Sequence, residues 1–172
     1  MTNIQLWGWN KKPRTMRRFL NSGDIFCFKY HNQYGFGKLL CKSLLGHYAE
    51  IFNYFSEQPD IKEKDILKSK RLLPPLIINT YVLFDRKLEG DWRIIGKQLN
   101  FKLTQEDKEL YYRWGIYPFL KISNMTEEIT KDIPVSDIMN YPLQSPYVDS
   151  SLKELIDYFI KNKKLPKSFF MP

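Results

Sequence analysis

Three consecutive strand-like segments constrain the fold of this chain more than any other feature of its sequence. They cover residues 25–30, 34–42 and 48–55, and they are joined by a short polar loop at 31–33 and by a turn that contains Gly46. Short runs rich in aromatic and branched residues, separated by turn residues, are typical of neighbouring antiparallel strands. The sequence therefore predicts a three-stranded meander.

Two glycines in the second segment indicate how this meander bends. Gly35 and Gly37 are two residues apart, so both lie on one face of the predicted strand. Glycine inside a strand marks a sharp bend or a close approach of backbone, as in a small barrel. With further predicted strands at 76–84, 92–96 and 117–122, the pattern favours an α+β fold. We expect an antiparallel, strongly curled, SH3-like sheet of about six strands with two or more helices packed on it.

Two helices are predicted after these strands. The first is expected to follow Thr104 as its N-cap and to end before Gly115. The second lies near the C-terminus, where Ser151 and Glu154 form a capping box and apolar residues recur at helical spacing. Pro166 is expected to stop this helix.

The length of 172 residues suits one compact domain, 1–172, that needs no disulfide or metal to fold. Within it we expect an irregular basic arm at 1–21, a mainly β body with one helix at 22–122, and a loop with the C-terminal helix at 123–172. The sequence contains no repeat and no low-complexity tract that would divide it further.

Composition and the N-terminus bear on where the protein works. Hydrophobic residues make up 43% of the chain and aromatic residues 16%, which excludes a disordered protein. No apolar run approaches the ~18 residues of a membrane span, and the basic N-terminus lacks the apolar core of a signal peptide. Cys27 and Cys41 are expected to be reduced thiols. We therefore expect a cytoplasmic protein.

Few residues offer catalytic or metal chemistry. His31 and His47 fall in predicted turns, and neither has an acidic neighbour at the spacing of a catalytic dyad. Cys27 and Cys41 do not form a C-x-x-C pair, although two cysteines and two histidines could in principle hold zinc. The simpler interpretation is two apolar thiols and two surface imidazoles.

Three acidic residues surround one predicted turn. Asp85, Glu89 and Asp91 could gather a cation, but acidic groups beside a glycine more often form a solvated turn. We therefore expect no catalytic residue, no metal site and no cofactor, and we expect that the protein is not an enzyme.

Aromatic side chains are dense in the meander, which suggests that some of them are displayed at the surface. Exposed aromatic residues anchor protein interfaces or stack on single-stranded nucleic acid. The alternative is a sheet with two apolar faces, one of them covered by helices. The residues concerned are Tyr30, Tyr34, Phe36, Tyr48, Phe52, Tyr54 and Phe55.

Two stretches of the sequence resemble a known family. The first comprises Gly23–Phe28, Tyr34–Lys38 and Ala49–Phe52, and the second comprises Pro75–Ile78 and Gly90–Gly96. This pattern of glycine and hydrophobic positions is similar to that of the immunity protein 26 family, which belongs to bacterial polymorphic-toxin and contact-dependent growth inhibition systems. The resemblance covers a little under half of the chain.

The resemblance implies an immunity protein that binds one cognate toxin, occludes its active site or substrate surface, and catalyses no reaction. Many such toxins are nucleases with basic clefts, so the net charge of +8 is unexpected: either acidic groups form the contact face, or the toxin surface bound here is acidic and lies away from the catalytic centre. We expect a 1:1 complex with the toxin domain, no membrane partner and no nucleic-acid partner. The expected toxin contacts are acidic clusters beside aromatic residues: Glu57, Asp60, Glu63, Asp65, Glu106, Asp107 and Tyr111.

Two other functions compete with this interpretation. A basic SH3-like nucleic-acid-binding module would need basic and aromatic residues interleaved on one strand face, and only Lys29, Lys38 and Lys42 supply them. A ribonuclease of the small-barrel toxin type also begins its first strand with Gly-Asp-Ile, but this chain lacks the Arg-Pro element expected soon afterwards.

Overall fold

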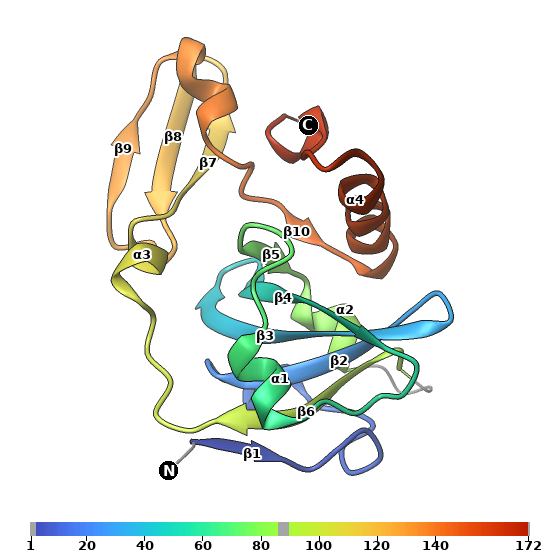
Figure 1. Ribbon diagram of the computed structural model, residues 1–172. Coiled ribbons are helices and arrows are strands. Elements are labelled where there is room, and N and C mark those ends of the chain that lie inside the picture. The colour runs from blue at the N-terminus through green and yellow to red at the C-terminus, as the bar shows by residue number, and fades with distance from the viewer. Residues whose placement is uncertain (1–2, 86–89, 172) are drawn as a thin grey trace. The chain divides into compact units, whose positions relative to one another are not determined.

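The predicted meander lies at the centre of a larger sheet. In the computed structural model, which describes residues 3–85 and 90–171, the strands β2 (Asp24–Tyr30), β3 (Gln33–Ser43) and β4 (Gly46–Ser56) pair in succession (Figure 1). These three strands are antiparallel to one another. The sequence pattern therefore identified the meander correctly.

Three further strands extend the meander on both sides. β6 (Trp92–Gln98) pairs with β2, β1 (Ile4–Leu6) pairs with β6, and β5 (Leu76–Ile78) pairs with β4. All of these pairings are antiparallel, so this part of the chain has the strand order β1-β6-β2-β3-β4-β5.

The chain divides into two compact units, Met1–Lys102 and Leu103–Pro172. The expectation that 1–172 forms one domain stays a prediction. The expected N-terminal arm contains the strand β1 and the 3-10 helix η1 (Arg17–Phe19), while residues 1 and 2 lie outside the described residues.

Apolar side chains cover both faces of the sheet in the first unit. On one face, Ile25 and Cys27 pack in a buried cluster with Ile66 from α1 (Glu63–Lys68). On the opposite face, Phe28 stacks on Trp92 with ring centroids 4.4 Å apart. Phe84, from α2 (Thr80–Phe84), meets the same indole edge-on. Because consecutive strand residues point to opposite faces, α1 and α2 cover opposite sides of the sheet.

The glycines of β3 allow aromatic rings to lie directly on the backbone. Gly35 pairs with Phe28 and Gly37 pairs with Phe26. A Cβ atom at either glycine would collide with the ring of its partner, and at Gly37 also with the backbone oxygen of Glu50. The predicted close approach is therefore an approach of aromatic rings, which glycine alone accommodates.

The second unit is built on a separate antiparallel sheet. Its strands are β7 (Tyr111–Ile116), β8 (Phe119–Asn124) and β9 (Thr130–Asp132), in that order. The other elements of this unit are α3 (Gln105–Lys108), η2 (Val135–Asn140), β10 (Pro146–Tyr147), α4 (Asp149–Asn162) and η3 (Lys167–Phe169).

The predicted fold class is wrong. The strands are divided between two sheets, the larger of which is mixed and includes a parallel pair, rather than joined in one strongly curled SH3-like sheet. Helices are few and short in the described residues: α1, α2 and α3 have six, five and four residues, and only α4 reaches 14. The sequence showed which runs are strands but not which strands share a sheet.

Single elements also differ from the prediction. The helix expected between Thr104 and Gly115 ends at Lys108, because the following Tyr111–Ile116 segment pairs with β8 as a strand. The strand expected over 76–84 ends at Ile78, and its second half forms α2. The C-terminal helix is present, but its N-cap is Val148, whose amide donates to the Ser151 hydroxyl.

None of the helices in the described part of the chain is both long and apolar enough to cross a membrane.

Candidate binding surfaces

The first acidic cluster lies before and within α1. Glu57 and Asp60 are exposed, whereas Glu63 and Asp65 are half-buried in the first turn of the helix. Carboxylates in a first turn favour the helix because they face its positive end. Ile61 and Ile66, which lie among these residues, are buried in the core cluster and hold the segment against the sheet. The four acidic residues therefore lie on one anchored segment of the first unit.

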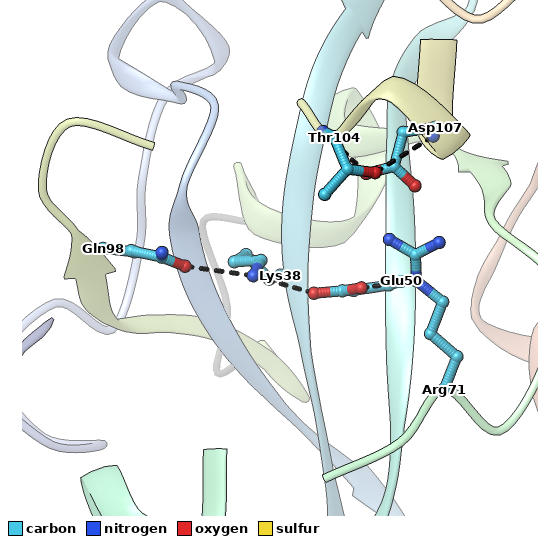
Figure 2. Close-up of polar contacts among 6 residues, drawn as sticks. All are labelled: Lys38, Glu50, Arg71, Gln98, Thr104 and Asp107. Carbon is cyan, nitrogen blue, oxygen red and sulfur yellow. Dashed lines mark hydrogen bonds and ion pairs between the residues drawn. The ribbon is translucent and has the colours of Figure 1, made fainter. Parts of the chain in front are cut away.

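The remaining predicted contact residues belong to the second unit. Glu106 is exposed, but Asp107 is buried, and its carboxylate accepts a hydrogen bond from the backbone amide of Thr104 (3.3 Å) (Figure 2). The Thr104 hydroxyl accepts one in return from the Asp107 amide, which completes a capping box. Tyr111 is half-buried, with the Lys131 ammonium 5.1 Å from its ring centroid. Asp107 thus holds α3 in place, and Glu106 is the acidic side chain that α3 presents to solvent.

A buried charge network that the sequence analysis missed crosses the larger sheet. Lys38 of β3 and Glu50 of β4 are register partners, and the Lys38 ammonium lies 2.9 Å from one carboxylate oxygen of Glu50 (Figure 2). Arg71 Nε donates to the other oxygen at 2.6 Å. Gln98 Oε1 accepts from Lys38 at 3.0 Å. Both oxygens of the Glu50 carboxylate are therefore matched by cations, so the network cross-links the sheet.

A signal for this network does exist in the sequence. Lys38 and Glu50 each interrupt an otherwise apolar strand run, and charged side chains that are buried in a sheet need a partner. Finding that partner requires the register of β3 against β4. The sequence alone does not supply it, because β-bulges shift the register twice along this pair.

The two histidines occupy unlike environments. His47 is buried, and its Nδ1 lies 2.9 Å from the Thr80 hydroxyl. Burial, with Arg17 and Lys42 nearby, lowers the pKa of His47 to about 4, so its ring is neutral at physiological pH. His31 is exposed in the β2–β3 turn.

The two cysteines and the acidic residues of the predicted turn show no metal-binding arrangement in the described residues. Burial raises the pKa of the Cys27 thiol, and Cys41 is half-buried. Asp85 pairs with Arg14 (2.5 Å) and Asp91 with Lys29 (3.4 Å), while Glu89 lies outside the described residues. Over residues 3–85 and 90–171, no three His, Cys, Asp or Glu side chains are grouped as metal ligands.

The aromatic residues of the meander are not displayed. Tyr30, Phe36, Tyr48 and Phe52 are buried, and the other three are half-buried. The interpretation with two covered apolar faces therefore describes this sheet.

Exposed aromatic and aliphatic side chains gather instead at the turn between β7 and β8. Ile116 is 84% exposed, Tyr117 73% and Phe119 78%, and Trp114 is also exposed. The sequence analysis missed them because it placed Trp114 in a helix and Tyr117 and Phe119 in a later strand. We call the surface formed by Ile116, Tyr117 and Phe119 the hairpin tip.

A hollow of about 500 Å³ lies elsewhere in the second unit, between α4 and the C-terminal turn. Tyr147, Leu155 and Tyr158 line it, and burial raises the pKa of Tyr147 to about 12. Glu154 is its one charged lining residue within the described range. The hollow offers apolar and hydroxyl contacts.

Comparison with known proteins gives one result. The sequence model of the family described as Immunity protein 26 matches residues 21–117, which is more than half of the chain. The matched part includes the meander, β5, β6, α3 and β7. No curated protein and no solved structure matches the chain.

Proposed function

Since the chain belongs to the Immunity protein 26 family, we propose that it binds one cognate toxin domain in a 1:1 complex and neutralises it by occluding its active site or substrate surface. The family match confirms the resemblance predicted from the sequence. It implies an immunity protein that acts against a toxin, and it suggests a role without catalysis. The finer proposal is a nuclease toxin of a bacterial polymorphic-toxin or contact-dependent inhibition system, neutralised in the cytoplasm.

The distribution of charge between the two units supports a nuclease as the target. Residues 1–102 hold 18 of the 27 Lys and Arg residues and nine of the 19 Asp and Glu residues. The first unit therefore carries a formal charge of +9 and the second unit −1. Clefts that bind nucleic acid are basic, and an inhibitor that fills one offers acidic groups. The positive total of +8 therefore comes from the first unit, and the nearly neutral second unit suits a basic toxin better than the total suggests.

We propose that exposed acidic side chains make the charged contacts. The candidates in the first unit are the exposed Glu57 and Asp60 and the half-buried Glu63 and Asp65 on α1. The candidates in the second unit are Glu106 of α3 and Tyr111, the first residue of β7. Asp107 supports them through the capping box that fixes the start of α3.

A pull-down of the tagged protein from a lysate of its source, with and without nuclease treatment, tests the function. We expect one protein in stoichiometric amount, insensitive to nuclease and encoded beside this chain. Expression of that protein alone should be toxic, and co-expression with this chain should restore growth. Recovery of nucleic acid, or of proteins that disappear after nuclease treatment, would replace the toxin with a nucleic-acid partner.

Charge reversal tests the acidic contacts. The double variant Asp60→Lys and Glu63→Lys should slow toxin association by about tenfold, because complementary charge steers encounter. Reversal of Glu154 and Asp157 on α4 changes the net charge by the same amount and serves as the matched control. Equal association rates for both variants would remove the α1 cluster from the contact surface.

A further inference from the structure

The hairpin tip exposes more apolar surface than the fold requires. Ile116, Tyr117 and Phe119 are each more than 70% exposed, so the second unit, to which they belong, leaves them uncovered. Monomeric proteins rarely display large apolar side chains in a contiguous patch, and such patches mark interaction sites. Tyrosine and phenylalanine are also enriched at the centres of protein interfaces.

A neighbouring element enlarges the apolar surface. The 3-10 helix η2 lies at the same end of the three-stranded sheet as the β7–β8 turn (Figure 1). Its Val135 and Met139 are 45% and 42% exposed. The backbone amide of Ile133 donates to Leu120 O at 3.1 Å, which ties the start of η2 to β8 behind the tip.

The strands that carry these side chains are cross-linked within their sheet. Ile116 and Phe119 are register partners across a two-residue connection. Trp114 Nε1 donates to Ser123 Oγ at 2.8 Å, and Ser123 Oγ lies 2.9 Å from Thr130 Oγ1, so one polar chain spans all three strands. An anchor that is already ordered loses little conformational entropy when it binds.

The charges of this part of the chain are mostly acidic. Residues 103–140 contain seven acidic and four basic side chains: Glu106, Asp107, Glu109, Glu127, Glu128, Asp132 and Asp137 against Lys108, Arg113, Lys121 and Lys131. Three of the four cations are engaged locally, and one of these is Lys131, which lies over the Tyr111 ring. Arg113 is buried and donates to Phe170 O, and Lys121 pairs with Asp132 at 3.1 Å. The Asp132 side chain remains 85% exposed, one strand away from Lys121.

We propose that the hairpin tip is the apolar anchor through which this protein docks on its toxin, in a recess of the toxin that is apolar inside and basic at its rim. This inference rests on the proposed function and adds the contact surface to it. The acidic surroundings select a basic protein partner over single-stranded nucleic acid and over an anionic membrane, since both of those are negatively charged. They also disfavour a symmetric contact between the hairpin tips of two copies, because two acidic rims would repel each other.

Ile116→Ser combined with Phe119→Ser tests the anchor. The control is Leu44→Ser, which removes an 86% exposed leucine from the β3–β4 turn of the first unit. The probe is the purified toxin domain encoded beside this chain, titrated calorimetrically against each full-length variant. We expect the double variant to bind at least about 100-fold more weakly, as loss of two interface hot spots predicts, and the control to bind like the wild type. Circular dichroism should show the same fold for all three proteins.

Each other outcome has a defined meaning. If the wild type neither binds nor neutralises this toxin, the proposed function fails and the anchor fails with it. If the wild type neutralises the toxin and the double variant binds equally well, only the anchor is overturned.

Three further measurements name the competing occupants. The three measurements are sedimentation with anionic phosphatidylglycerol vesicles, anisotropy with labelled oligouridine, and light scattering of the chain alone. We expect none of them to detect binding or self-association that depends on Ile116 and Phe119, so the double variant Ile116→Ser and Phe119→Ser should behave like the wild type in each. A signal of that kind would assign the hairpin tip to a membrane, to RNA or to a second copy, and would overturn the proposal.

Discussion

Glu50→Gln removes one charge from the buried network and changes almost nothing in side-chain shape. The Glu50 and Lys38 side chains are only 9% and 13% exposed, so the substitution leaves the Lys38 ammonium in the sheet without its counter-charge. Removing one partner of a buried ion pair costs roughly 3–5 kcal/mol. Gln98 Oε1 still accepts from Lys38, and Arg71 reaches solvent, so we expect the lower end, about 3 kcal/mol.

Urea unfolding followed by tryptophan fluorescence measures this cost. With a slope of about 2 kcal/mol per molar urea, the midpoint should fall by roughly 1.5 M. Lys38→Met is the companion variant, because Glu50 then keeps its 2.6 Å contact with Arg71. Its cost should be smaller, and the double variant should be more stable than the sum of the single costs predicts.

The reasoning fails under two results. The free energy of unfolding of Glu50→Gln could lie within about 0.5 kcal/mol of the wild-type value, which is the usual range for surface substitutions. That result would show that the network does not stabilise the sheet. Additive costs of Glu50→Gln and Lys38→Met would show that the two side chains do not interact.

Two further predictions concern stability. Gly37→Ala should cost about 3 kcal/mol in chemical denaturation, because its Cβ would meet the Glu50 backbone oxygen and an aromatic ring, whereas Gly90→Ala, with its nearest neighbour 3.5 Å away, should be close to neutral. Similar costs for both would contradict the close approach in β3. The pKa of His47 is lowered from 6.5 to about 4 in the folded chain. As the pH falls, the unfolded chain therefore takes up a proton at His47 at a higher pH than the folded chain does. Its contribution to stability is therefore present above pH 6.5 and is lost as the pH falls towards 4, by up to about 3 kcal/mol. Unfolding measured across this range should show a flatter pH dependence for His47→Gln than for the wild type; equal profiles for the two proteins would refute the assignment.

Local chemistry made some features readable from the sequence. The capping role of Thr104 was predicted correctly, because a threonine followed by acidic residues satisfies the first backbone amides of a helix wherever it occurs. The helix nevertheless ended after one turn. Tyr111 and the residues after it have high strand propensity, and β8 offered them a pairing partner.

Other features depended on partners that are distant in the chain. The second half of the predicted 76–84 strand became α2, where Phe84 packs on Phe26 with ring centroids 5.8 Å apart. Nothing within the segment itself announces that contact. The same holds for Lys38. In the sequence it resembles an exposed charged residue, and only the pairing of β3 with β4 places Glu50 beside it.

The candidate contact residues divide in the same way. Clustered acidic residues are visible in the sequence, and Glu57, Asp60 and Glu106 are indeed exposed. Asp107 looks equivalent to Glu106 in sequence, but it is buried in a capping box. Exposure is a property of the packed chain, so two acidic residues at adjacent positions have opposite environments.

The sequence by itself determined the meander, the family and the C-terminal helix, because each rests on residue type and short-range spacing. The tertiary structure alone decided which strands share a sheet, which charges are buried, and which aromatic residues reach solvent. Sheet pairing joins residues far apart in the chain, and one shift of register turns every side chain to the other face. The hairpin tip therefore became recognisable as a surface only when β7 and β8 were seen to pair and the side chains of their turn were found to be exposed.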